Sequence, residues 1–236
     1  MTEERIIRPS KNILGSLRLP GDKSISHRYG MLAAFAEGTS RFTNFSTGAD
    51  CASTLSCMEA LGAQVRRVDD GTVEVTGVGG RVTPCDAPLD CGNSGSTMRM
   101  ISGLLAPQEG RFTLVGDESL SRRPMERIRK PLEMMGARLV LTEGHAPLTI
   151  VGGALKAIDY TTPVPSAQVK TCILLAGLQT AGETTVREAV RTRDHSELAL
   201  RAFGVKLTRT LDSISISGPQ KLHAIEIGRA SCRERV

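Results

Sequence analysis

The chain has 236 residues, of which 40% are hydrophobic and 23% charged, which is enough apolar material for one large core or two small ones. Its net charge is +5, but basic and acidic residues alternate along most of the sequence, which favours a small anionic ligand over a polyanion. Aromatic residues make up only 3%, which argues against single-stranded nucleic acid as a ligand, and no apolar run is long enough to span a bilayer.

The predicted elements form a repeating series along the chain. A short strand precedes a helix with apolar residues at i, i+3 and i+4, and these strands are expected at 40–45, 111–115 and 184–190. Each helix is expected to end at an apolar residue followed by Gly62, Gly136 or Gly204, because glycine favours helix C-termini. Two alternating strands with a turn between them come next, which predicts a hairpin. The first two hairpins are expected at 64–67 with 72–76 and at 138–141 with 148–151.

A stretch rich in Ser and Thr, closed by a basic residue, occurs three times. The closing residues Arg28, Arg99 and Lys170 are spaced 71 residues apart. The glycines that follow each stretch, Gly38, Gly110 and Gly182, are spaced 72 apart. An internal period of this length indicates a repeated unit that buries its apolar faces only by packing against its neighbours. We therefore predict an α+β fold, one domain of three pseudo-symmetric βαβαββ units around a common core.

Each of the three stretches lies directly before an apolar-periodic helix, where unpaired backbone N–H groups attract anions. Three such ends that converge would form one concave site for phosphate and carboxylate groups. In the alternative interpretation Ser24, Ser94 and Ser166 only cap their helices, which is the commoner role of such residues. Capping leaves unexplained the cations placed where the helix dipole disfavours them. These cations are Lys23, Arg28, Arg99 and Lys170.

Two further segments carry arginines ahead of predicted helices. Arg122 and Arg123 suit a bidentate grip on carboxylate or phosphate, although two adjacent arginines also suit a solvated surface. Arg193 precedes Asp194, which is a possible N-cap of an ordinary helix. Neither segment decides the function by itself.

Four motifs together resemble the 5-enolpyruvylshikimate-3-phosphate synthase family, from about residue 9 to about residue 226. The segment 19–28, LPGDKSISHR, is similar to the family's N-terminal signature, and 90–99, DCGNSGSTMR, to its second signature. The segment 121–125, SRRPM, resembles the family's phosphoenolpyruvate-contacting arginine motif, and 165–170, PSAQVK, its third repeat.

The resemblance implies transfer of the enolpyruvyl group of phosphoenolpyruvate to shikimate 3-phosphate, with release of phosphate. This is a cytoplasmic step of chorismate and aromatic amino acid biosynthesis, and it implies no metal and no cofactor. The residues expected to hold shikimate 3-phosphate are Lys23, Ser24, Arg28, Ser166, Ala167, Gln168 and Arg193. Those expected to meet phosphoenolpyruvate are Lys23, Gly95, Arg123 and Gln168, with Asn93, Ser96 and Arg99 in support. Lys23 is the expected catalytic residue.

The resemblance also predicts the domain organisation. Residues 1–11 are expected to belong to a second domain, 12–226 to form the N-terminal domain, and 227–236 to be a non-native tail similar to a translated sequencing adapter. The principal acidic catalytic groups are expected from the missing C-terminal domain, so this half should bind weakly and turn over poorly. Gly95 stands where glyphosate-tolerant relatives often have alanine, which implies that the complete enzyme is sensitive to glyphosate.

Two other functions stay open from the sequence. The related UDP-N-acetylglucosamine enolpyruvyl transferase shares the chemistry, but it normally has asparagine where this chain has Ser24. The second alternative is a non-catalytic module that binds a phosphorylated metabolite. The six cysteines form no CxxC pair and have no His at zinc-ligand spacing, so they are interpreted as reduced thiols.

Overall fold

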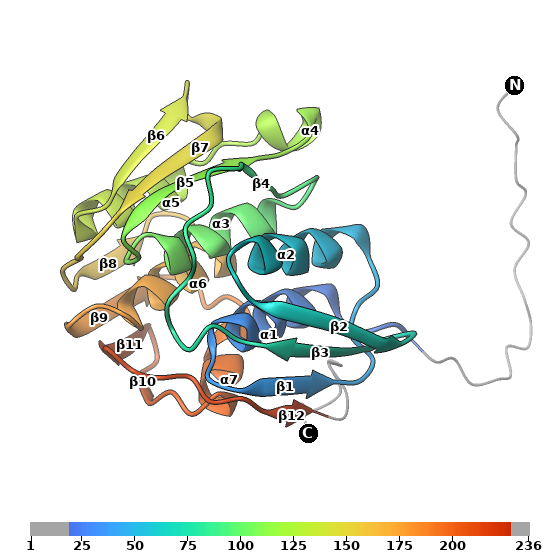
Figure 1. Ribbon diagram of the computed structural model, residues 1–236. Helices are drawn as coiled ribbons and strands as arrows, with labels where there is room; N and C mark the ends of the chain where they lie inside the picture. Colours follow the sequence, from blue (N-terminus) through green and yellow to red (C-terminus); the bar gives the residue numbers. More distant parts are fainter. Residues whose placement is uncertain (1–18, 228–236) are drawn as a thin grey trace, which may run out of the picture.

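The computed structural model of the protein describes residues 19–227, and the predicted series of elements appears in it three times (Figure 1). The first unit contains α1 (Lys23–Phe35), β1 (Thr39–Phe42), α2 (Ala49–Ala60), β2 (Gln64–Asp69) and β3 (Thr72–Thr76). The second contains β4 (Leu89–Asp90), α3 (Gly95–Leu105), β5 (Gly110–Val115), α4 (Glu118–Ser121), α5 (Glu126–Met135), β6 (Arg138–Thr142) and β7 (His145–Gly152). The third contains β8 (Asp159–Thr162), α6 (Ala167–Gly177), β9 (Gly182–Glu188), α7 (His195–Ala202), β10 (Leu207–Arg209) and β11 (Ser213–Gly218), and β12 (Glu226–Ile227) follows it.

Each unit builds one four-stranded sheet with the same topology. In the second unit the order is β4-β5-β7-β6, with β4 parallel to β5 and the other neighbours antiparallel. The third unit repeats this arrangement as β8-β9-β11-β10. The α+β fold of three equivalent units is therefore confirmed, with the short helix α4 as an addition that the sequence did not predict.

The sheet of the first unit is completed by the other end of the described chain. Its order is β12-β1-β3-β2, and β12 takes the parallel position beside β1 that β4 and β8 hold in the other units. The opening strand expected near residue 12 lies outside the described residues. Ile227 pairs with Phe42, so the boundary expected after residue 226 falls inside β12, whereas 228–236 of the predicted tail lie outside the described range.

Helices α1, α3 and α6 lie between the three sheets and form the centre of the core (Figure 1). In α6 every residue except Gln168 is buried. Helices α3 and α6 approach closely at Gly103, where a Cβ atom would lie 2.0 Å from the carbonyl oxygen of Cys172. The absence of a side chain at Gly103 is therefore what permits this contact.

The outer helices end as the sequence predicts. Gly62, Gly136 and Gly204 have φ angles of 106°, 108° and 89°, and each follows the last turn of α2, α5 or α7. A left-handed residue at this point lets the chain leave the helix and begin the hairpin.

Neither a membrane segment nor a metal cluster is found in the described part of the chain. No helix between residues 19 and 227 is both long and apolar enough to cross a bilayer, and no three His, Cys, Asp or Glu side chains there gather as metal ligands. The five described cysteines, Cys51, Cys57, Cys85, Cys91 and Cys172, are free thiols. Cys232 lies outside the described residues.

Candidate functional site

The N-termini of the three central helices lie at one end of the core. Gln168, in the first turn of α6, donates from Nε2 to Ser96 Oγ in the first turn of α3 at 2.9 Å. Arg28 of α1 donates to Thr171 Oγ1 of α6 at 3.1 Å. The other ends also lie together, because Phe35, Gln108 and Gln179, at or after the ends of α1, α3 and α6, line one cavity. The three helices therefore run in the same direction, and the positive ends of their dipoles point to the same side.

The three helices are capped in equivalent ways, but not by the three serines considered above. Ser94 and Ser166 accept bonds from Thr97 N and Val169 N, whereas α1 is capped by Asp22, which accepts from Ile25 N at 2.8 Å. These caps are spaced 72 residues apart, like the glycines. Ser24 lies inside α1, so its hydroxyl is available for another partner.

The 71-residue spacing of the basic residues does not place them at equivalent positions. Arg28, Arg99 and Lys170 lie six, five and four residues after their caps. Each residue along a helix rotates the side chain by roughly 100°, so the three cations point in different directions. Lys170 is fully buried, and its Nζ lies 2.8 Å from Glu188 Oε2 and 2.9 Å from Glu197 Oε1. The interpretation of Lys170 as part of the anion site is therefore wrong.

Six predicted residues gather around the start of α3: Asn93, Gly95, Ser96, Arg99, Arg123 and Gln168, here termed the α3 cluster. Gly95 lies beneath two guanidinium groups, because a Cβ atom there would be 2.8 Å from Arg99 Nη1 and 3.5 Å from Arg123 Nη1. Arg99 donates from Nη1 to Gln168 Oε1 at 2.9 Å and from Nη2 to the Pro124 carbonyl at 3.1 Å.

The arginines of the α3 cluster are held by neutral groups. Arg123 donates to Asn93 Oδ1 and, at 3.3 Å, to Ser119 Oγ, and neither Arg99 nor Arg123 takes part in a salt bridge recorded between residues 19 and 227. Burial lowers the pKa of Arg99, and the positive charges of Arg123 and Arg127 lower it further. The α3 cluster thus concentrates positive charge that an anion would balance.

Asp117 orients the Asn93 side chain through a hydrogen bond that the sequence did not predict. Asn93 donates from Nδ2 to Asp117 Oδ2 at 2.6 Å, while Asp117 Oδ1 caps α4 by accepting from Leu120 N at 2.8 Å. The Leu120 amide and then Asn93 lower the pKa of Asp117. Because Asn93 donates to Asp117, its carbonyl oxygen turns toward Arg123. The helix-capping pattern at Asp117-Glu118 is the sequence signal that could have identified this residue.

A second group, here termed the α1 cluster, contains Ser24, Arg28, Thr171, Arg193 and Ser196. Arg28 is 5% exposed and donates from Nε to Ser196 Oγ at 2.7 Å and from Nη1 to the Ser24 carbonyl at 2.7 Å. The exposed Arg193 donates to Ser24 Oγ at 3.3 Å. Burial, and then the charge of Arg193, lower the pKa of Arg28 to about 10. Ser196 and Thr171 were missed by sequence reasoning, because their role depends on contacts far along the chain.

The remaining predicted residues lie at the same end. Lys23 begins α1, and its exposed Nζ pairs with Asp50 Oδ2 at 2.7 Å. Ser166 and Ala167 form the cap and first residue of α6, directly before Gln168. Asp194 stands at the N-cap position of α7, and its carboxylate lies 3.4 Å from the Arg209 guanidinium.

A buried chain of polar groups leads from α1 to the cap of α3. His27 Nδ1 lies 2.6 Å from Thr54 Oγ1, which lies 2.7 Å from Thr97 Oγ1, which donates to Ser94 Oγ at 2.8 Å. Burial lowers the pKa of His27 to about 4, with smaller and partly opposing effects of Asp50, Arg28 and Lys23, so the imidazole is neutral at pH 7. No local pattern in the sequence signals this chain, since its members come from three helices.

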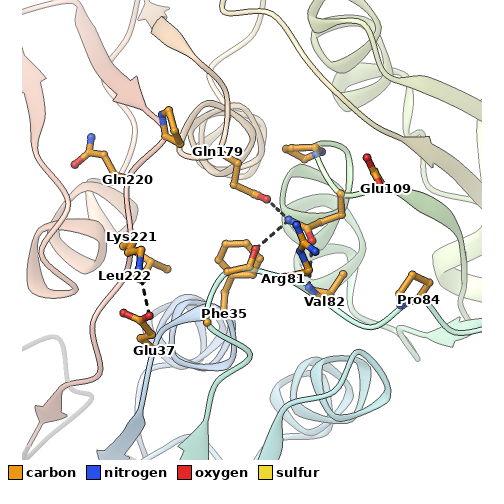
Figure 2. A pocket seen from close by; sticks show the side chains of 15 residues that line it. Phe35, Glu37, Arg81, Val82, Pro84, Glu109, Gln179, Gln220, Lys221 and Leu222 are labelled. Carbon is orange, nitrogen blue, oxygen red and sulfur yellow. Dashed lines mark hydrogen bonds and ion pairs between the residues drawn. The ribbon is translucent and has the colours of Figure 1, made fainter.

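A cavity of about 720 Å³ lies at the opposite end of the central helices (Figure 2). Its lining includes Phe35 at the end of α1, Gln179 after α6, and Arg81, Glu37 and Lys221. None of the predicted substrate-binding residues lines it. Helix C-termini carry partial negative charge, which makes this end less suited to phosphate than the end that carries the two clusters.

The arginines gathered where the central helices of this three-unit α+β domain begin are the arrangement expected of a protein that binds small anions. The family model described as EPSP synthase (3-phosphoshikimate 1-carboxyvinyltransferase) matches residues 7–228. The chain belongs to this family.

Relatives and solved structures agree with that assignment. A 3-phosphoshikimate 1-carboxyvinyltransferase from Koribacter versatilis is 62% identical over 93% of this chain and 52% of its own length. A protein of the same name from Solibacter usitatus is 55% identical, again over 93% of this chain and 52% of its own length. The structure of EPSP synthase from Acinetobacter baumannii superimposes with a TM-score of 0.89 and 45% identity, over 91% of this chain and 49% of that one. The chain thus spans about half the length of the relatives it matches.

Proposed function

We propose that this chain is the shikimate 3-phosphate and phosphoenolpyruvate-binding half of a 3-phosphoshikimate 1-carboxyvinyltransferase. Membership of the EPSP synthase family and the similar relatives support the reaction. The observation that carries the proposal is the junction of the two arginine clusters through α6. Gln168 belongs to the α3 cluster and bonds Arg99, while Thr171, one turn further on, belongs to the α1 cluster and bonds Arg28, so two anionic substrates bound there would be neighbours.

The α3 cluster is the proposed site for phosphoenolpyruvate. Arg99 and Arg123 are bonded to neutral acceptors, so a carboxylate or phosphate can replace a weaker partner with a charge-assisted bond. Gly95 leaves room beneath both guanidinium groups for the ligand to approach the start of α3. The helix dipole adds to the attraction.

The α1 cluster is the proposed site for shikimate 3-phosphate. Ser24, Arg28 and Arg193 offer a hydroxyl and two guanidinium groups, and the first turn of α6 supplies Ser166, Ala167 and Gln168 beside them. Arg28 is held rigidly by three bonds, while Arg193 is exposed and is available to grip the phosphate.

The proposed chemistry is addition followed by elimination. The sugar hydroxyl gives up its proton as it attacks C2 of phosphoenolpyruvate, while C3 takes a proton. The tetrahedral adduct then loses phosphate from C2 and a proton from C3, which restores the double bond. Both substrates are anions, so the two clusters would offset their repulsion with groups already in place. Lys23 is the proposed catalytic residue, at the start of α1 and paired with Asp50, and further acid and base groups would come from the rest of the protein.

Calorimetric titration of the chain with each substrate tests this function. We expect shikimate 3-phosphate to bind, phosphoenolpyruvate to bind more tightly in its presence, and shikimate without the phosphate or UDP-N-acetylglucosamine not to bind. Release of phosphate from the two substrates should stay near background. No binding of either substrate, or rapid phosphate release, would contradict the proposal.

The proposed site of action is the cytoplasm. The five described cysteines are free thiols, and four of them are buried. Cysteines without disulfide bonds suit a reducing compartment.

A further inference from the structure

The buried Lys170 connects the core to both ends of the loop that carries Arg193. Lys170 lies in the second turn of α6, Glu188 is the last residue of β9, and Glu197 lies in the first turn of α7. The loop 189–194 runs between the two glutamates, and both accept from the single Lys170 ammonium. One buried cation therefore sets where this loop begins and where it ends.

The loop is tied to the same group from within. Thr192 donates from Oγ1 to Glu188 Oε1, the oxygen that Lys170 does not use. The next residue is Arg193, whose guanidinium reaches Ser24 across the surface. Arg193 is thus connected to Lys170 through two hydrogen bonds, from Lys170 to Glu188 and from Thr192 to Glu188, because it follows Thr192 in the chain.

The same ion group also supports Arg28. Glu197 is followed on α7 by Leu198 and preceded by Ser196, which accepts from Arg28 Nε at 2.7 Å. The charge of Glu197 favours the charged form of Arg28. Within the buried group Lys170 and Arg28 balance Glu188 and Glu197, which leaves the exposed Arg193 as the cation in excess.

A fully buried ion group of this kind is a poor stabiliser, because desolvation of the charges offsets most of their attraction. Apolar residues of similar volume often stabilise a core as well or better. The directed hydrogen bonds of Lys170 have a different effect, since they hold β9, α6 and α7 in one relative placement.

We propose that Lys170 is a positioning residue for the sugar phosphate, which holds the loop 189–194 and α7 so that Arg193 and Arg28 grip that group together. The inference rests on the proposed function for the identity of the ligand, but not for the effect on the loop. The proposal predicts that the geometry of the α1 cluster depends on Lys170 and that the geometry of the α3 cluster does not.

The test replaces the whole ion group by apolar residues in Lys170→Met/Glu188→Leu/Glu197→Leu, because the single Lys170→Met variant leaves two carboxylates buried without their cation. Arg187→Gln is the matched control. It removes the exposed ion pairs with Asp159 and Asp212, and neither of these partners lies in the loop or in α7. Both variants and the unaltered chain are compared by thermal unfolding, amide hydrogen exchange and calorimetric titration.

We expect the apolar variant to unfold at about the same temperature as the unaltered chain and its loop 189–194 to exchange about tenfold faster. Its affinity for shikimate 3-phosphate should fall by about tenfold or more, which corresponds to the loss of one oriented charge-assisted bond. The affinity for phosphoenolpyruvate alone should change by less than about twofold, and Arg187→Gln should leave all three measurements unchanged.

Unchanged loop exchange in a folded apolar variant would overturn the proposal, as would an equal loss of both ligands. Failure of the apolar variant to fold would assign Lys170 to the stability of the unit and overturn it too. If the unaltered chain binds no shikimate 3-phosphate, the proposed function fails, while the exchange measurement still decides whether Lys170 positions the loop.

Discussion

The α3 cluster and the α1 cluster hold their arginines in different ways. Arg99 and Arg123 are bonded to amide, hydroxyl and carbonyl oxygens, and burial, followed by repulsion from Arg123, lowers the pKa of Arg99. Arg28 also donates to hydroxyl and carbonyl oxygens, but the buried carboxylate of Glu197, which pairs with Lys170, in addition favours its charged form. The α3 cluster has unbalanced positive charge near the surface, whereas the α1 cluster has its positions set from inside the core. Anion binding should therefore relieve repulsion in the first and exploit a fixed geometry in the second.

The largest expected effect comes from Lys170→Met alone. It leaves Glu188 and Glu197 buried without their cation, and we expect the free energy of unfolding to fall by about 3–5 kcal/mol. Urea unfolding followed by circular dichroism measures the change. Arg99→Met is the matched variant from the α3 cluster, and it should cost less than about 1 kcal/mol because it also removes repulsion. Equal costs would remove the distinction between the clusters.

The pH dependence of stability tests the polar chain that leads from α1 to the cap of α3. The pKa of His27 is lowered from 6.5 to about 4 in the folded state, so the unfolded chain binds the proton more readily. The stabilisation is fully present above pH 6.5 and is lost as the pH falls through about 4. It should amount to roughly 3 kcal/mol. In His27→Asn the free energy of unfolding, measured with urea, should change less between these pH values than in the unaltered chain. The same pH dependence in both proteins would show that His27 is not buried as a neutral group.

The paired variants Arg123→Ala and Arg193→Ala test whether the clusters bind different substrates. Removal of one charged hydrogen-bonding group typically weakens binding by about 10- to 100-fold. We expect Arg123→Ala to lose affinity for phosphoenolpyruvate and Arg193→Ala to lose affinity for shikimate 3-phosphate, each by that amount in calorimetric titrations. Loss of both ligands in both variants would mean that the clusters act as one site.

The smallest expected effect is that of Gly95→Ala. The new methyl group would lie 2.8 Å from Arg99 Nη1, the far end of a flexible side chain, so the fold should tolerate it at a cost below about 1 kcal/mol. The methyl group narrows the space beneath the arginines, so the affinity for phosphoenolpyruvate should fall by a few-fold and that for glyphosate by more. Titration of both ligands into the variant and the unaltered chain measures the difference. An unchanged glyphosate affinity would show that the ligand does not lie against Gly95.

Short-range chemistry made most of the fold predictable from the sequence. The hairpins at 64–76 and 138–151 follow from alternation and turn residues, and the helix ends follow from Gly62, Gly136 and Gly204. Such signals depend on a few adjacent residues, so they survive without knowledge of the rest of the chain. The short helix α4 was missed. The pairing of β12 with β1, which completes the first sheet, was missed as well, because a strand of two residues is defined only by its partner.

The site was only partly predictable for a related reason. Gly95, Arg99, Arg123 and Gln168 were named from motifs, and they do lie together. Lys170 was grouped with Arg28 and Arg99 from a spacing of 71, one residue short of the 72-residue spacing of the helix caps. A difference of one residue is small along the sequence, but it turns a helical side chain to another face of the helix. Lys170 therefore lies between two glutamates in the core.

The sequence by itself determined the repeat, the units and the end of each central helix at which the polar and basic residues of the proposed site gather, because caps, glycines and periodicity act over a few residues. Tertiary structure alone decided which cations face the site, which are paired in the core, and how His27 comes to be linked to Ser94 through Thr54 and Thr97. Those outcomes depend on rotation about the helix axis and on partners from other helices and strands, and a local sequence pattern predicts neither.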